Sequence, residues 1–230
     1  MIKSLLRLGK DMITNWKYNA KKSIKGNIGI LFVISLIISI PSLFNLDFAD
    51  LFDNLNKIFE LFGLDSLISN ELITFVSIVG FFSSIVYIFV MGPFTLSEHY
   101  VYLNVAKNNY IEVVDSFYGF KDYWASVKLY FLMTIYTFLW SMLFLIPGII
   151  KGYAYSMAPY ILAENPGMSA RECIKKSVEI TTGNKANLFF LDLSFIGWNI
   201  LVLLTGGILG IWIVPYYKAS KAHAYLDIEF

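Results

Sequence analysis

Two ionisable side chains lie within long apolar stretches of the sequence, where a charge is costly. Asp192 and Lys151 each interrupt such a stretch. A charged residue in hydrocarbon usually pairs with another group, lines a polar cavity or extends to the interface. Asp192 lies two helical turns after Lys185, about 10 Å along a helix. Asp192 therefore either lines a polar cavity, which could hold a cation, or pairs with a basic residue, the candidates being Lys185, Lys218 and Lys221.

No motif for catalysis or for a cofactor accompanies these charges. The sequence has no glycine-rich phosphate loop, no His-Glu-x-x-His and no Gly-x-Ser-x-Gly. The single cysteine, Cys173, excludes an intrachain disulfide. His99 and His223 lack the spacing of zinc ligands, and we interpret both as interfacial residues. We therefore expect no cofactor, no metal ion and no enzymatic activity.

The composition predicts an integral membrane protein. Hydrophobic residues make up 57% of the 230 residues and charged residues 15%, and the mean hydropathy is +0.62. Soluble domains are about 45–50% apolar and about 25% charged. The net charge of +1 gives no indication of a nucleic-acid partner. The expected partners are membrane lipid and, as a second option, another membrane protein.

Apolar segments and helix breakers predict an all-α, multi-pass transmembrane bundle of about six spans. About 20 apolar residues cross a bilayer core. Gly92 and Pro93 should bend or end the second span. Tight turns at Pro147-Gly148 and at Gly206-Gly207 should each lead into a short return helix. The expected transmembrane domain is 28–217, with spans near 28–46, 72–96, 129–146, 148–163, 187–205 and 207–217.

Two amphipathic segments flank the first span. Residues 1–27 are basic, with apolar residues at helical spacing. This segment either lies at the cytoplasmic interface or packs as an ordinary cytosolic helix. Residues 47–71 are acidic and carry a helical apolar stripe. We expect a helix there, lying on the outer surface or packed against neighbouring spans.

Three further segments are expected outside the hydrocarbon. A turn at Asn108-Asn109 should precede a second interfacial helix within 109–126. Ser169 and Glu172 have capping-box spacing and predict a short helix over 170–182. Gly183 suits the position that closes that helix. Residues 218–230 form the expected cytoplasmic tail.

The basic residues predict the orientation. If the N-terminus lies inside, the six-span arrangement places every lysine and arginine on the inner side except Lys57 and Lys151. Such a bias is typical of cytoplasmic loops. We therefore expect both termini in the cytoplasm of a bacterial cell. Lys151 should extend its amine from the outer turn to the interface.

One tryptophan and two glycines recur at the same spacing in the two broken stretches. They are Trp140, Gly148 and Gly152 in the first stretch, and Trp198, Gly206 and Gly210 in the second. Each set is followed by a Pro-Tyr pair, Pro159-Tyr160 or Pro215-Tyr216, two positions out of register. The spacing indicates a parallel internal repeat, with chance as the alternative because such residues are common in membrane helices.

The same stretches carry a family resemblance over nearly the whole chain. The motifs are those at 25–27, 119–123, 145–153, 161–166, 194–198 and 215–216, together with Ser177 and Gly183. They resemble the bacterial membrane-protein family catalogued as domain of unknown function nine hundred and seventy-five. The chain is more distantly similar to the membrane portion of some glycerophosphodiester phosphodiesterases. The catalytic barrel of that enzyme is absent, so the resemblance implies a fold and no reaction.

These observations favour a non-enzymatic membrane protein that binds lipids or membrane partners. The alternative is a transporter or channel component for a small solute or peptide, which would use the broken helices and Asp192. Asn199 extends a polar stripe from Asp192 and should face the protein interior with it. Glu164 should end the fourth span and either lie at the interface or bond near Ser177 or Arg171. The candidate functional or structural residues are Pro147, Gly148, Lys151, Glu164, Ser177, Gly183, Asp192, Trp198, Asn199, Pro215 and Tyr216.

Overall fold

The computed structural model describes residues 2–41, 57 and 70–229. The described part is all-helical and contains no strand. The predicted acidic helix over 47–71 and the end of the first predicted span lie almost wholly outside the described residues. The elements are α1 (Ile2–Ser23), α2 (Ile28–Ser39), α4 (Asn70–Ala106), the 3-10 helix η3 (Val113–Phe120), α5 (Tyr123–Leu143), α6 (Leu145–Tyr155), α7 (Ala158–Glu164), α8 (Ala170–Ile180), α9 (Lys185–Leu193), α10 (Ile196–Leu204) and α11 (Gly210–Glu229).

Within the described residues, two helices are long and apolar enough to cross a membrane. They are Tyr123–Leu143 and the continuous unit Lys185–Leu204. A third span is present if Gly9–Ser23 and Ile28–Ser39 count as one span broken by a 100° bend. Large apolar side chains at the tips of the α5–α6 and α10–α11 connections are exposed, including Phe144 and Leu203. This surface indicates membrane association. Among the described residues, two or three of the six predicted spans are therefore candidates, and the six-span arrangement stays a prediction.

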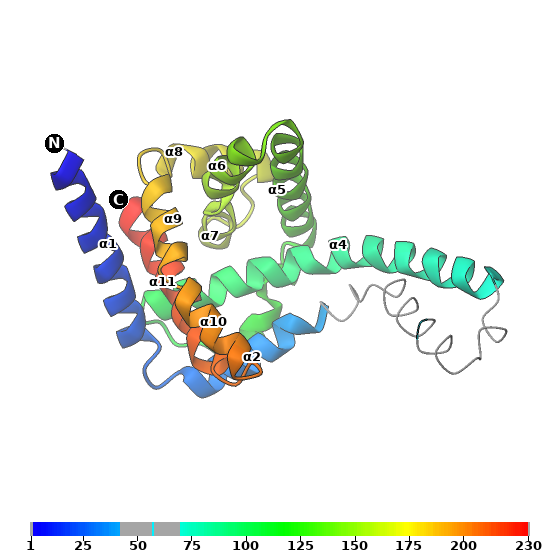
Figure 1. Ribbon diagram of the computed structural model, residues 1–230. Helices are drawn as coiled ribbons and strands as arrows, with labels where there is room; N and C mark the ends of the chain where they lie inside the picture. The colour runs from blue at the N-terminus through cyan, green and yellow to red at the C-terminus, as the bar shows by residue number, and fades with distance from the viewer. Residues whose placement is uncertain (1, 42–56, 58–69, 230) are drawn as a thin grey trace.

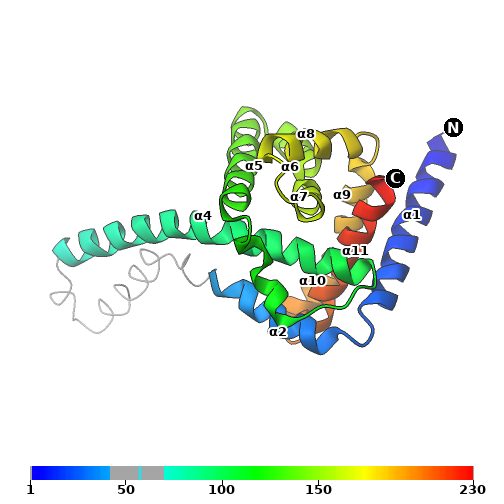
Figure 2. The ribbon, with the colours of Figure 1, turned by 180° about the vertical axis from the view of Figure 1, so that it is seen from behind.

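Helix α4 continues through Pro93 to Ala106, so of the two predicted outcomes, a bend or an end, the end at Gly92-Pro93 is wrong. The Ser97 hydroxyl donates to the Pro93 carbonyl, at 2.9 Å, and accepts the Gly119 N–H. Gly119 lets η3 cross α4 closely, since a Cβ there would lie 2.0 Å from the Pro93 oxygen. The long helix α4 is thus the element against which both η3 and α5 pack (Figures 1 and 2).

Helices α5 and α6 form a hairpin whose break is at Phe144 and not at Pro147-Gly148. Phe144 is extended, with φ −157° and ψ 142°. Pro147 lies in the first turn of α6, where a missing N–H costs nothing. Gly148 is a contact site, because a Cβ there would lie 2.8 Å from the Ser141 Cα. Gly148 therefore allows the two arms to approach closely.

The predicted return helix over 148–163 is two helices, α6 and α7. The fold is held at their junction by Ser177 of α8, whose hydroxyl donates to the Ala154 carbonyl at 2.7 Å and accepts the Met157 N–H at 3.2 Å. Helix α7 ends at Glu164, as expected. The capping box of Ser169 and Glu172 begins α8, although α8 ends at Ile180, slightly earlier than predicted.

The second broken stretch follows the prediction more closely. Gly206 and Gly207 have positive φ values of 61° and 91° and form the turn between α10 and α11. Gly183, with φ 88°, separates α8 from α9. A short turn at Ser194 and Phe195 also separates α9 from α10 within this stretch. Gly148 and Gly206 therefore share a sequence spacing but not a backbone conformation, so the repeat does not extend to the turns.

Helix α11 runs through Pro215 to Glu229, and the expected tail is part of it. It packs along α1. The Trp16 indole N–H donates to Asp227 at 2.7 Å, and Ser23 lies 3.0 Å from His223 Nε2. The apolar side of α1 around Trp16 and Ala20 is thus covered by protein. This favours the packed-helix alternative for that face, and an interfacial role of the exposed basic face stays a prediction.

Candidate functional site

Asp192 of α9 lies at the centre of a polar network with three partners. The carboxylate accepts the Tyr153 hydroxyl at 2.8 Å and the Tyr217 hydroxyl at 3.0 Å. Lys221 Nζ lies 2.8 Å from Oδ1 and 2.9 Å from Oδ2. We call these four residues the Asp192 network. Of the three lysines that the sequence offers as partners, the structure selects Lys221, which lies about one helical turn after Tyr217.

A pocket of about 180 Å³ lies beside the Asp192 network. We call it the polar pocket. It contains an ion pair between Lys218 of α11 and Glu98 of α4. His99 and Tyr160 contact each other edge to face across it, with ring centroids 4.5 Å apart. Its walls come from α4, the α6–α7 connection, α7 and α11, through Glu98, His99, Tyr102, Ser156, Tyr160, Tyr217, Lys218 and Lys221.

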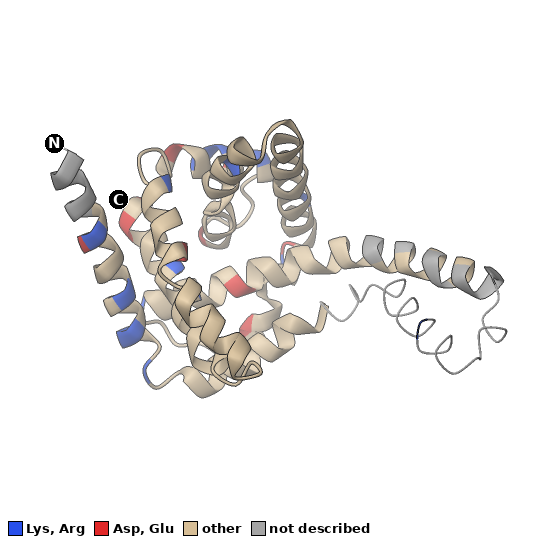
Figure 3. Ribbon diagram, in the orientation of Figure 1, with Lys and Arg blue, Asp and Glu red and all other residues tan. Residues whose placement is uncertain are grey.

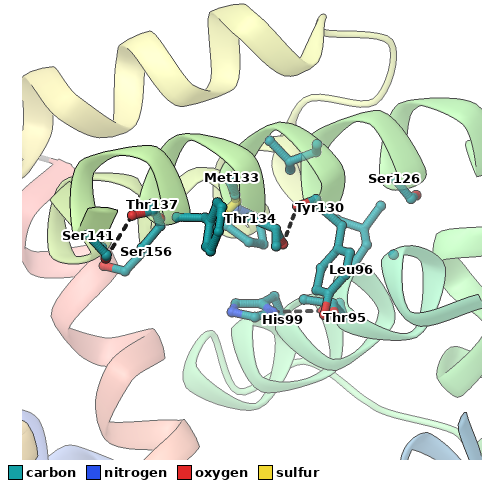
Figure 4. A pocket seen from close by; sticks show the side chains of 15 residues that line it. Thr95, Leu96, His99, Ser126, Tyr130, Met133, Thr134, Thr137, Ser141 and Ser156 are labelled. Carbon is teal, nitrogen blue, oxygen red and sulfur yellow. Dashed lines mark hydrogen bonds between the residues drawn. The ribbon is translucent and has the colours of Figure 1, made fainter. Parts of the chain in front are cut away.

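A larger groove of about 610 Å³ lies between α4, α5, α6 and α7 (Figure 4). We call it the apolar groove. Its walls include Leu96 of α4, Leu129 and Met133 of α5, and Gly152 of α6. The volume lies within the range of about 300–1,000 Å³ that is common for small-molecule sites. His99 and Ser156 line both cavities, so the apolar groove adjoins the polar pocket.

Several hydroxyl groups along the groove donate to their own helices. Thr134 donates to the Tyr130 carbonyl at 2.9 Å, and Ser141 donates to the Thr137 carbonyl at 2.8 Å (Figure 4). Ser156 likewise donates to the Tyr153 carbonyl at 2.8 Å. Such back-bonding satisfies the hydroxyl donor inside the helix. The groove therefore offers an occupant mainly apolar contacts, despite its serines and threonines.

His99 lies where the apolar groove adjoins the polar pocket. Its Nδ1 lies 2.7 Å from the Thr95 carbonyl, which can only accept, so Nδ1 carries a proton. The other ring nitrogen lies on the far side of the ring from Thr95 (Figure 4). If the imidazole is neutral, that Nε2 is a hydrogen-bond acceptor.

The charges are distributed unevenly over the helices (Figure 3). Helix α10 carries no charged residue, whereas α1 and α8 carry several basic residues. Lys151 of α6 lies with Nζ 4.8 Å from the Trp140 ring centroid. This cation–π contact with α5 gives Lys151 a partner within the hairpin. No group of three or more His, Cys, Asp or Glu able to hold a metal ion occurs in the described ranges.

Glu164, the last residue of α7, connects α7 with α11 and with the residue that follows α4. It does not bond near Ser177 or Arg171, as one of the two predictions had it. It pairs with Lys107, which follows α4, and accepts the hydroxyl of Tyr225 in α11. Burial and the adjacent carboxylate raise the pKa of Tyr225 well above its usual value, so its hydroxyl stays protonated. Glu164 therefore has a structural reason to be present in the motif at 161–166.

The remaining predicted residues lie away from the two cavities. Trp198 is 44% exposed and Asn199 is exposed, so Asn199 does not continue a buried polar stripe from Asp192. Tyr216 packs edge to face on Phe195, with centroids 5.1 Å apart. Pro215 lines a small cavity next to the Gly206-Gly207 turn. The structure thus brings Asp192 to the candidate site and leaves the other motif residues in packing and turn positions.

Sequence reasoning missed Glu98 and Tyr153 as parts of the site. Tyr153 belongs to the motif at 145–153, and Tyr217 follows the motif at 215–216. Neither residue is charged, so neither stands out as costly within an apolar stretch. Glu98 and His99 were placed beyond a break that does not occur. The sequence feature that could have indicated this site is the i, i+3 pair Lys218 and Lys221, because that spacing places two amines on one face of a helix.

Comparison with protein families gives one match. The family model described as "Protein of unknown function (DUF975)" matches residues 142–229. The match supports that family. It covers less than half of the chain, but it includes Tyr153, Asp192, Tyr217 and Lys221. No curated protein and no solved structure matches the chain.

Proposed function

We propose that this protein is a non-enzymatic membrane protein that binds an amphiphilic lipid. One observation carries the proposal: the apolar groove and the polar pocket meet at His99 and Ser156. An acyl chain would bury its apolar surface in the groove, which contributes about 25 cal/mol per Å² removed from water. A polar head group would then reach the charged residues Glu98 and Lys218. A solute of uniform polarity would match only one of the two cavities.

The second candidate is a transporter or channel component that uses Asp192. Transport would be favoured by a polar cavity that reaches an available carboxylate. Here the Asp192 carboxylate already accepts three donors and is absent from the lining of both cavities. A mainly apolar groove with a polar end therefore favours lipid binding over solute passage.

For the topology, we propose that the protein resides in the bacterial cell membrane with both termini on the cytoplasmic side. The distribution of basic residues supports this orientation. Reporter fusions to Met1 and Phe230 test it. A periplasmic or extracellular signal from either end would contradict this orientation.

Photo-crosslinking tests the lipid site directly. A lipid with a photoreactive group in its acyl chain should label α4 and α5 at the groove, around Leu96 and Met133. Thr134→Trp would fill the groove and should reduce that labelling at least about tenfold. Leu139→Trp is the matched control, because Leu139 lies on the same helix, is 52% exposed and does not line the groove. Labelling spread evenly over the exposed faces, unchanged in Thr134→Trp, would refute the site.

A further inference from the structure

The polar pocket contains charges of both signs, held in place from different helices. Lys218 pairs with Glu98 across the α11–α4 contact, and Lys221 pairs with Asp192 of α9. Asp192 does not line the pocket, but its contact with Lys221 offsets the charge of that lysine, so these four residues together have a net charge of zero. An ordinary anion site would present an excess of positive groups, and an ordinary cation site an excess of negative groups. Because Asp192 offsets the charge of Lys221, the remaining pair of Lys218 and Glu98 gives this pocket neither excess.

The charged groups retain capacity for a ligand. Lysine has three donors, and a carboxylate has about four acceptor positions. The side chains of Lys218 and Glu98 are 29% and 19% exposed, so the ion pair can be reached from the pocket. Lys221 is 14% exposed and is held by both oxygens of Asp192. Each ion pair can therefore share its groups with a ligand without being broken.

Aromatic rings complete the walls around the carboxylate. Tyr102, Tyr160 and Tyr217 all line the pocket with Glu98. The face of a tyrosine ring attracts an ammonium group electrostatically. The ring of Tyr217 already lies below an amine, with Lys221 Nζ 5.6 Å from its centroid. The lysine amines suit a phosphate, and the Glu98 carboxylate with the tyrosine rings of the lining suits an ammonium.

We propose that the polar pocket recognises a zwitterionic head group of the phosphoethanolamine type, an inference that rests on the proposed lipid-binding function. The phosphate accepts from Lys218 and Lys221, and the ammonium donates to Glu98 beside the tyrosine rings. A zwitterion leaves the pocket neutral, and both of its charges meet a group of opposite sign. A purely anionic head group would place its excess charge beside Glu98. A purely cationic amphiphile would face two lysines.

Competition binding tests the head group on the full-length protein in detergent. The displaced probe is a fluorescent single-chain lysophosphatidylethanolamine. The competitors share one acyl chain and differ in head group: phosphoethanolamine, phosphoglycerol and an alkylammonium. We expect the phosphoethanolamine lipid to compete at least about tenfold better than the other two. Free phosphoethanolamine, which lacks the chain, should not compete at millimolar concentration. Effective competition by the free head group would overturn the proposal that the ligand is a lipid.

Charge variants provide a readout that a structural role would not change. Glu98→Gln leaves excess positive charge, so the preference should move toward the phosphoglycerol lipid. Lys218→Gln should move it toward the alkylammonium. Lys176→Gln is the control, because it breaks a distant ion pair with Glu229 and should leave the ranking unchanged.

The outcomes separate the two proposals. Equal competition by all three head groups, or a preference for phosphoglycerol in the unmodified protein, would overturn the head-group assignment and leave the groove as a lipid site. If the probe itself does not bind, both the head-group assignment and the proposed function fail. A ranking that does not shift in opposite directions in Glu98→Gln and Lys218→Gln would also overturn the assignment.

Discussion

The Asp192 network should contribute measurably to stability, and Asp192→Leu is the direct perturbation. The substitution removes the acceptor of two tyrosine hydroxyls and the counter-ion of Lys221, whose side chain is only 14% exposed. Breaking a fully buried ion pair costs about 3–5 kcal/mol, and partial exposure lowers that figure. We expect a loss of about 2–4 kcal/mol.

Thermal unfolding in detergent measures this loss. For a chain of this size, 1 kcal/mol shifts the Tm by about 2–4 °C, so the Tm of Asp192→Leu should fall by roughly 5–15 °C. The double variant Asp192→Leu/Lys221→Leu removes the unpaired amine as well and should recover part of the loss. Glu179→Leu, on an exposed position of α8, is the control. A Tm of Asp192→Leu equal to that of the parent would refute the reasoning.

Three further predictions concern single positions. Gly119→Ala should destabilise the protein by more than about 2 kcal/mol in chemical denaturation, because the new Cβ would overlap the Pro93 oxygen, whereas Gly197→Ala, with open space around it, should not. Ser177→Ala removes two buried hydrogen bonds and should cost about 1–3 kcal/mol by the same measurement; no change would contradict its bridging role. Burial raises the pKa of the Cys173 thiol to about 11, so little of the reactive thiolate is present at pH 8. Alkylation of Cys173 by iodoacetamide at pH 8, measured by mass spectrometry, should therefore be more than about 100-fold slower in the folded than in the unfolded protein. Equal rates would show that the thiol is accessible.

Local signals in the sequence predicted the elements whose cause is local. The capping box of Ser169 and Glu172 and the turn at Gly206-Gly207 depend on one or two residues and appear as expected. The cost of an isolated charge left two alternatives for Asp192, a polar cavity or a pair with one of three lysines, and the structure shows the pair with Lys221.

Proline and glycine were less reliable guides where the surroundings decide their effect. Pro147 is compatible with the first turn of a helix, so the break moved to Phe144, which no propensity identifies. Pro93 lies within α4, and the Ser97 hydroxyl donates to its carbonyl. Because the second span was predicted to stop near Pro93, the prediction separated Glu98 from the rest of the site.

The polar pocket itself was not predictable from sequence. Its ion pair joins Glu98 and Lys218, which lie on helices far apart in the chain. Only the crossing of α4 and α11 brings them together, and no periodicity reports such a crossing. Likewise, the apolar groove is lined by residues of four helices, α4 to α7, and its side chains resemble any other apolar helix face.

The most direct test of lipid binding is the mass of what the purified protein carries. Native mass spectrometry of the detergent-extracted chain should detect one bound amphiphile, and Thr134→Trp should lose it while Leu139→Trp retains it. A parent protein without bound lipid after mild extraction, or a Thr134→Trp variant that retains the same lipid in the same amount, would contradict the assignment of the apolar groove as a lipid site.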